Sequence, residues 1–116
     1  SSDVCSSDLR MDFAKLMNMA EDGTKVGLTV LGPNMAWGRE MLLWNASKLM
    51  QTCTNSEEIV SMLTVNPAEF FGVSDRIGQL KAGLDADYLI YEGNPIEKCN
   101  AVLLETVING ETVYQA

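Results

Sequence analysis

Apolar residues recur at helical spacing near the start of the chain. Beginning at Phe13, they occupy positions i, i+3, i+4 and i+7, which predicts an amphipathic helix. Asp12 can cap the start of this helix, and Gly23 can end it by adopting the left-handed conformation. The next run, residues 25–31, is apolar on both alternating faces and stops at Gly32. Such a run is typical of a strand buried on both sides, so a helix followed by it suggests a parallel sheet.

Three helices are predicted in the middle of the chain. An apolar stripe over residues 36–52 predicts a long helix. Thr54 and Glu57 have the spacing of a capping box in front of a second amphipathic run. Asn66 suits the N-cap of a third, short helix, which Gly72 can close.

The last part of the chain carries strand signals. Residues 88–91 form an apolar run between glycine-containing turns, and residues 103–108 and 111–114 flank Asn109 and Gly110, a dipeptide typical of a type I′ hairpin turn. The pattern therefore predicts a helical half followed by a strand-rich half.

Composition narrows the class of protein. The 116 residues include 8 Lys plus Arg and 16 Asp plus Glu, a formal charge of −8, with 47% apolar residues. This balance is typical of a folded domain, and isolated basic residues on an acidic chain argue against binding of nucleic acid. The chain has no His, which excludes catalytic sites of the Ser-His-Asp and Cys-His types and the zinc-binding HExxH helix.

The cellular compartment follows from two further features. No apolar run approaches the length of a membrane span, and the first residues lack the basic and apolar regions of a signal peptide. The three cysteines have neither the spacing of a redox pair nor the even count of a disulfide framework. We therefore expect a cytoplasmic protein that binds neither membrane nor nucleic acid.

The loop after the predicted strand is the most site-like position in the sequence. Ligands of parallel α/β folds bind outside the carboxyl ends of the strands, where Gly32, Asn34, Arg39 and Glu40 would line the mouth. Gly32, Asn34 and Arg39 are therefore predicted to lie near a substrate. A purely structural loop is the alternative.

Two other features are interpreted structurally. Asp85 and Asp87 resemble half of an acid–base pair or of a metal clamp, but their glycine-rich surroundings favour turn and strand-edge hydrogen bonds. Trp37 and Trp44 lie seven residues apart and could form a stacking platform. Packing in a core or an interface is the preferred interpretation.

Residues 1–9 need a separate interpretation. Their sequence, SSDVCSSDL, resembles the translation of a common sequencing adapter, which marks the segment as an artefactual scar and removes it from the fold prediction. A natural terminus rich in Ser and Asp is the alternative. If the segment is a scar, the native protein is expected to extend upstream of Arg10.

The second half of the chain resembles a known family. The residues that carry the resemblance are TVNPA at 64–68, Gly72, DRIGQLKAGLDAD at 75–87, GNP at 93–95 and VINGETVY at 107–114. In this order and spacing they are similar to the C-terminal end of the amidohydrolase superfamily, and imidazolonepropionase-like proteins are the nearest members.

The resemblance implies a fold. Residues 25–31 would be the last strand of a (β/α)8 barrel, the following helices would close the barrel, and the C-terminal strands would belong to a small β-sandwich built from both chain ends. A whole barrel needs about 250 residues. The chain is therefore expected to be an α/β C-terminal fragment, with residues 10–72 ending the barrel and residues 73–116 forming part of a composite β-sandwich.

The resemblance also implies an activity. The family hydrolyses amide or cyclic amide C–N bonds other than peptide bonds, with a divalent metal, zinc or a similar ion, that activates water. The metal ligands are mostly histidines, so no metal ligand and no catalytic residue carries over onto this chain, which is expected to be inactive alone. Leu31 stands where the family has an Asp at the end of the last strand, and Asn34 is the candidate substitute.

Three hypotheses stay open. The first is a fragment of an active amidohydrolase, whose full-length form takes a small-molecule substrate and is a possible homo-oligomer. The second, favoured by Leu31, is a catalytically degenerate relative that serves as a binding or scaffold protein. The third is a self-contained acidic interaction module that starts at Met11. An upstream His-x-His pair would distinguish the first hypothesis from the other two.

Overall fold

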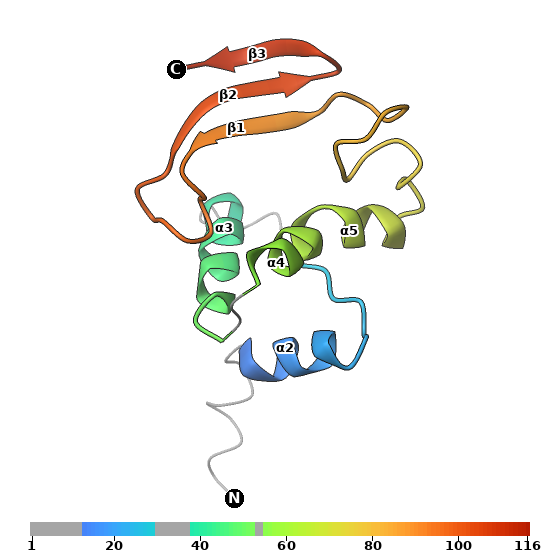
Figure 1. The fold of residues 1–116 in the computed structure, drawn as a ribbon, viewed down its shortest axis with the longest axis vertical. Helices are drawn as coiled ribbons and strands as arrows, with labels where there is room; N and C mark the ends of the chain where they lie inside the picture. Colours follow the sequence, from blue (N-terminus) through green and yellow to red (C-terminus); the bar gives the residue numbers. More distant parts are fainter. Residues whose placement is uncertain (1–12, 30–37, 53–54) are drawn as a thin grey trace, which may run out of the picture.

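The chain folds into helices followed by a small antiparallel sheet. A computed structural model describes residues 13–29, 38–52 and 55–116. The elements, in chain order, are α2 (Phe13–Glu21), α3 (Gly38–Leu49), α4 (Ser56–Leu63), α5 (Val65–Phe70), β1 (Tyr88–Glu92), β2 (Val102–Ile108) and β3 (Glu111–Gln115). The strands form a layer at one end of the molecule, with α3, α4 and α5 beneath them and α2 farthest away (Figure 1).

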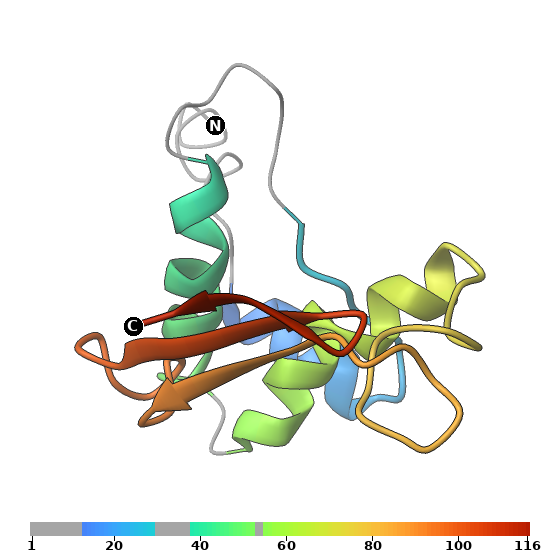
Figure 2. The ribbon, with the colours of Figure 1, turned by 90° about the horizontal axis from the view of Figure 1, so that it is seen from above.

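The sheet has the order β1-β2-β3, and both pairs are antiparallel. Seen from above, α3 stands near one end of the strands and the loops that follow α5 lie at the other (Figure 2). Asn109 and Gly110 both have positive φ, 52° and 78°, between the paired residues Ile108 and Glu111. These angles confirm the predicted type I′ turn.

The core lies among the helices and reaches the sheet through a loop. Six buried residues form one cluster: Met17, Ala46, Leu49, Ile59, Met62 and Ile96. Ile96 belongs to the loop between β1 and β2, so burial of this side chain holds the strand-rich half against the helical half. Trp44 is 53% exposed, with the Lys48 ammonium 5.6 Å from the centre of its ring, and it lies outside that cluster.

Two helices end in the predicted glycines. After α2, the Gly23 N–H donates to the Ala20 carbonyl and the Thr24 N–H to the Met19 carbonyl, and Gly23 has a φ of 88°. This pair of bonds is a Schellman motif. The same motif ends α5, where Gly72 has a φ of 69°. Both C-terminal predictions are confirmed.

Two N-cap predictions are wrong. The N-cap of α4 is Asn55, whose side chain accepts a hydrogen bond from the Glu57 N–H at 3.1 Å, whereas the predicted cap, Thr54, lies outside the described residues. Helix α5 begins at Val65, one residue before its predicted cap Asn66. Asn66 therefore lies inside the first turn of α5 and not at its cap, and its side-chain N–H donates to the backbone of Val26.

The predicted strand over residues 25–31 is not a strand in its described part. Residues 24–29 have no regular structure. A parallel strand forms only when a neighbouring strand completes its hydrogen bonds, and among the described residues the only sheet is the C-terminal meander. The chain therefore combines helices with an antiparallel sheet. None of the described helices is long and apolar enough to cross a membrane.

Candidate functional site

The predicted substrate-proximal residues follow residues 24–29 in the chain. Gly32 and Asn34 lie outside the described residues, as does Leu31. Arg39 and Glu40 belong to the first turn of α3, but their side chains also lie outside the described part of the structure. The structure therefore describes how the chain enters this region, through residues 24–29.

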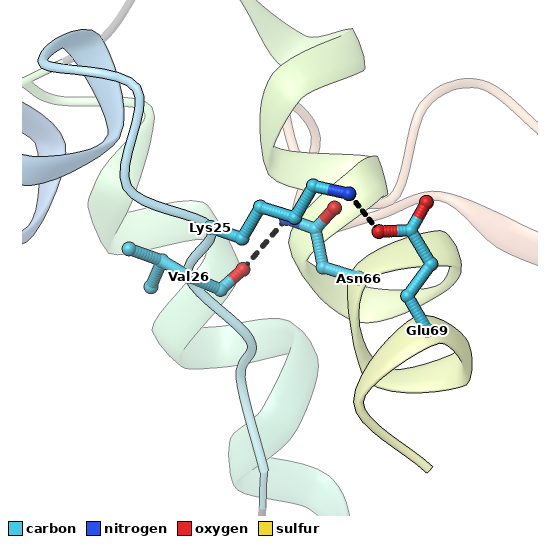
Figure 3. Close-up of polar contacts among 4 residues, drawn as sticks. All are labelled: Lys25, Val26, Asn66 and Glu69. Atoms are coloured by element: carbon cyan, nitrogen blue, oxygen red, sulfur yellow. Dashed lines mark hydrogen bonds and ion pairs between the residues drawn. The ribbon is translucent and has the colours of Figure 1, made fainter. Parts of the chain in front are cut away.

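The junction between α4 and α5 holds residues 25–28 by three polar contacts, and Figure 3 draws two of them, Asn66 with Val26 and Lys25 with Glu69. The Asn66 side-chain amide donates to the Val26 carbonyl at 2.8 Å. The Leu28 N–H donates to the Met62 carbonyl, also at 2.8 Å. The Lys25 ammonium pairs with the Glu69 carboxylate. Met62 lies in the last turn of α4, where carbonyls lack a partner within the helix, so Leu28 satisfies one of them.

The apolar side chains of the same segment face the core. Val26 and Leu28 are half-buried and pack against the core cluster, while Lys25, Gly27 and Thr29 are exposed. The predicted burial on both faces is therefore wrong for the described residues, because only one of the two alternating faces is covered. The segment has the burial pattern of a strand, but its described hydrogen bonds come from a helix junction.

Gly27 lies directly against α5. A Cβ at this position would stand 2.9 Å from Phe70 Cε2 and 3.6 Å from Pro67 Cγ. A Cβ closer than about 3 Å forces a neighbour to move, so only glycine allows this approach without a shift. Each of the residues 25–28 therefore contacts α4 or α5. Lys25 does so through its side chain, Val26 and Leu28 through backbone groups, and Gly27 through the close approach of its backbone.

The strengths of the polar contacts differ. The Lys25 and Glu69 side chains are 59% and 36% exposed. Because solvent screens exposed ion pairs, such a pair contributes about 0–1 kcal/mol to stability. The Asn66–Val26 bond is partly buried and joins residues forty positions apart. Since a buried carbonyl without its donor costs about 1–3 kcal/mol, this bond contributes more than the ion pair.

Three of the hollows on the surface of the described residues lie beside the elements named above. One of about 490 Å³ lies between α5, the following loop and β1, and one of about 620 Å³ lies between α3 and the loop after β1. Apolar side chains dominate the lining of both. The third, about 220 Å³, flanks residues 24–26 and is lined by polar groups that include Lys25, Ser61 and Asn66. The Asn66 and Lys25 side chains already have partners in the junction.

The two carboxylates weighed as an acid–base pair have structural roles. Asp85 Oδ2 accepts from Arg76 Nη2 at 2.9 Å, and the Asp85 N–H donates to the Arg76 carbonyl at 2.8 Å. Asp87 Oδ1 accepts from the Asn109 N–H at 2.7 Å. These contacts confirm the interpretation as turn and strand-edge hydrogen bonding.

The described residues do not form a metal centre of the kind that the family resemblance implies. The sequence has no His, and the described residues contain no group of three or more His, Cys, Asp or Glu side chains placed to hold an ion. Such a site needs three or four donors that converge on one point. A metal therefore does not fit the residues that this part of the chain supplies.

Comparisons with known proteins give the family. The sequence profile of the Amidohydrolase family matches residues 33–114, and the chain belongs to this family. The structure is similar to that of an amidohydrolase from Thermotoga maritima MSB8, with a TM-score of 0.77 and 27% identity. That match covers 90% of this chain and 26% of the Thermotoga protein.

A second amidohydrolase structure has the same fold over the same extent. Its TM-score is 0.68 at 20% identity, and the match covers 90% of this chain and 26% of that protein. No curated protein sequence matches the chain. The chain thus spans about a quarter of the length of the amidohydrolases that it resembles.

The sequence did not reveal the Asn66 contact with Val26. Asn66 precedes a proline, a pairing that also suits a helix start, and local chemistry favoured that interpretation. Only the fold brings residues 26 and 66 together, so no local signal could have identified the hydrogen bond.

Proposed function

We propose that the chain is the C-terminal portion of a metal-dependent amidohydrolase that cleaves amide or cyclic amide C–N bonds other than peptide bonds. The family match over residues 33–114 carries this proposal, together with the 26% of the Thermotoga protein that the chain covers. The substrate would be a small molecule. In this proposal the remainder of the catalytic machinery precedes the chain in the full-length protein.

The proposal includes a division of the chain. Residues 10–72 would complete a (β/α)8 barrel, with residues 25–31 as its last strand and α3, α4 and α5 closing it. The burial pattern of Val26 and Leu28 supports this role, because it is strand-like although no described strand pairs with the segment.

Residues 73–116 would form part of a composite β-sandwich. On one face of the sheet the cross-strand neighbours Leu89, Thr106 and Tyr114 line up, and Leu89 and Tyr114 are 54% and 49% exposed. A three-stranded sheet with exposed apolar side chains needs a further layer to cover it. Strands from the N-terminal part of the polypeptide would supply that layer.

The chemistry would be divided between the two parts of the protein. A divalent metal in such an enzyme activates the attacking water. The described residues form no group of ligands for it, and in this proposal the chain alone would be inactive. Its contribution would be Gly32, Asn34 and Arg39 beside the substrate.

The first test is to read the coding DNA upstream of the Arg10 codon. We expect an open frame of some hundreds of codons with a His-x-His pair and later histidines. A stop codon just before Met11, or a genome that itself encodes SSDVCSSDL, would contradict the proposal and leave a small acidic interaction module.

The second test is catalytic. The full-length protein, loaded with zinc, should release free amine from at least one member of a panel of N-acetyl amino acids or open the ring of a cyclic imide such as succinimide. The 116-residue chain, assayed in parallel, should release none. A full-length protein that carries the histidines and binds zinc but is inactive on every probe would contradict the proposed bond class.

A second candidate function rests on Leu31. The family resemblance puts an Asp at this position, and loss of a positioned general base costs about 10²–10⁴ in rate. A catalytically degenerate binding or scaffold protein would have a full-length upstream frame without the histidines. The same DNA read therefore distinguishes it from the hydrolase.

A further inference from the structure

The turn between β2 and β3 carries a chemically reactive pair of residues. Asn109 and Gly110 form the only Asn-Gly dipeptide in the sequence, and both residues are exposed. An asparagine followed by glycine is especially prone to deamidation, because glycine has no side chain to hinder attack of its backbone nitrogen on the asparagine amide. The local sequence thus provides a modification site, and the fold decides how fast this site reacts.

Deamidation uses the Gly110 backbone nitrogen as its nucleophile. After this nitrogen loses its proton to hydroxide, it attacks Cγ of Asn109 and a new C–N bond forms. The bond from Cγ to the side-chain nitrogen breaks, and that nitrogen takes a proton from water and leaves as ammonia. Water then opens the five-membered succinimide at either carbonyl, which gives aspartate or isoaspartate. Water and hydroxide are the only co-reactants that the reaction needs.

In the folded chain both backbone N–H groups of the turn already have acceptors. The Gly110 N–H donates to the Ala86 carbonyl at 3.0 Å, and the Asn109 N–H donates to Asp87 Oδ1 at 2.7 Å. We call these two bonds the tip clamp. They hold the turn while its φ values are 52° and 78°, and the Gly110 proton stays between two backbone groups. The Gly110 nitrogen is therefore a poor nucleophile until the tip clamp opens.

Asp87 provides the half of the tip clamp that a substitution can remove. Hydrogen bonds to an ionised acceptor are shorter and stronger than neutral ones, in agreement with the 2.7 Å of this contact. The Ala86 bond joins two backbone groups and cannot be deleted by changing a side chain. Because Ala86 and Asp87 are consecutive and bond to consecutive residues, loss of the Asp87 bond also loosens the Ala86 bond.

We propose that Asn109 is a site of spontaneous deamidation and that the tip clamp sets the rate at which the folded protein is modified there. Local opening of a turn is fast, whereas deamidation is slow. The rate of modification therefore follows the equilibrium population of the open tip. Every residue in this account belongs to the described C-terminal part of the chain, and the proposal is independent of the proposed hydrolase function.

Tandem mass spectrometry of the tryptic peptide 99–116 measures the reaction, because replacement of the side-chain NH2 by OH raises the mass at residue 109. The full-length protein, or the 116-residue chain if the upstream frame is absent, is incubated at neutral pH both folded and in guanidinium chloride. An unincubated sample gives the baseline. In the wild type, Asn109 should deamidate more slowly when folded than in denaturant.

Asp87→Ala is the decisive variant. In the folded state it should deamidate at Asn109 about fivefold faster than the wild type, the factor that corresponds to one hydrogen bond. In denaturant the two rates should be equal, because residue 87 lies 22 positions away along the chain. Asp87→Asn keeps an oxygen acceptor and should accelerate the reaction less. Asn100 in the same peptide is exposed and precedes alanine, so its slow reaction should not respond to any of these changes.

Gly23→Ala is the matched control for stability. It strains the left-handed turn after α2, where Gly23 has a φ of 88°, and so weakens the protein while leaving the tip clamp intact. Its folded-state rate at Asn109 should equal that of the wild type.

Three results would each overturn the proposal: a wild-type rate that is the same folded and in denaturant, an Asp87→Ala rate that does not rise in the folded state, or equal acceleration by Gly23→Ala. The last result would mean that global unfolding, and not opening of the tip clamp, exposes the site. Should Asp87→Ala not fold, Asp87→Val, which also lacks an acceptor, is measured in its place with the same acceleration expected.

Discussion

The carboxylate of Asp87 accepts a hydrogen bond from the backbone N–H of Asn109 at 2.7 Å. Asp87 immediately precedes β1, and Asn109 is the first residue of the turn between β2 and β3. The bond therefore joins the start of the first strand to the hairpin made by the other two. The neighbouring backbone bond from the Gly110 N–H to the Ala86 carbonyl, at 3.0 Å, strengthens the same connection.

Removing the Asp87 carboxylate should loosen this connection. Asp87→Ala should lower the free energy of unfolding by about 1 kcal/mol, the usual net value of such a hydrogen bond. Urea denaturation measures the difference. Asp75→Ala, which removes an exposed carboxylate from the turn at 74–76, is the control and should change stability by less than half as much. Equal losses would mean that the effect is one of charge and not of this bond.

Gly78 and Gly83 form a natural pair for separating backbone strain from steric clash. Both have left-handed φ values, 104° and 93°, but a Cβ at Gly78 would stand 2.8 Å from the Ala68 Cβ, whereas nothing lies within 4 Å at Gly83. Gly83→Ala should therefore cost about 1 kcal/mol from strain alone. Gly78→Ala should cost a further ~1–3 kcal/mol from overpacking. Thermal or urea unfolding that gives equal values would refute the close approach at Gly78.

The effect of Gly27→Ala on the free energy of unfolding should change sign when Phe70 is replaced by alanine. Gly27→Ala brings its new Cβ to 2.9 Å from the Phe70 ring, so in the wild type it should destabilise the protein by about 1 kcal/mol. In a Phe70→Ala background the clash is gone. The smaller freedom of alanine in the unfolded chain should then make the same substitution stabilising by ~0.4–1 kcal/mol. A double-mutant cycle measures the coupling, and additive effects would contradict the contact.

The ion pair between Arg76 and Asp85 should contribute little. The two side chains are 70% and 33% exposed, and pairs of this kind couple by about 0–1 kcal/mol. A double-mutant cycle with Arg76→Gln and Asp85→Asn should find a coupling in this range that shrinks in 1 M salt, where the screening length falls to about 3 Å. A coupling well above 1 kcal/mol that salt leaves unchanged would indicate a buried network instead.

Local chemistry explains which parts of the fold the sequence could predict. Gly23, Gly72 and the Asn109–Gly110 turn were predicted correctly because each depends on the φ preference of one or two residues. The three C-terminal strands were also predicted correctly, because an apolar run between turns and a hairpin turn dipeptide mark them in the sequence. Family membership followed from the order of several short motifs, none of which is specific alone.

The errors share a physical cause. Residues 25–31 were predicted to form a strand buried on both faces, but only Val26 and Leu28 are half-buried and residues 25, 27 and 29 are exposed. Strand pairing also depends on a neighbour that the pattern of one segment does not specify. Asn66 was assigned to a cap because local rules favour it there, but α5 begins one residue earlier, and the Asn66 side-chain N–H donates to the Val26 carbonyl forty residues away. The predicted site residues Gly32, Asn34 and Arg39 stay predictions.

The two halves of the molecule should assemble at different speeds. The strands pair in sequence order, and β2 and β3 are joined by a two-residue turn. The three-stranded sheet can therefore form through contacts between residues that are close along the chain. The Val26–Asn66 bond has to close a loop of forty residues first, at an entropic cost that local pairing avoids. Docking of residues 25–28 is therefore expected late when the complete chain refolds from denaturant, after the hairpin of β2 and β3 has formed.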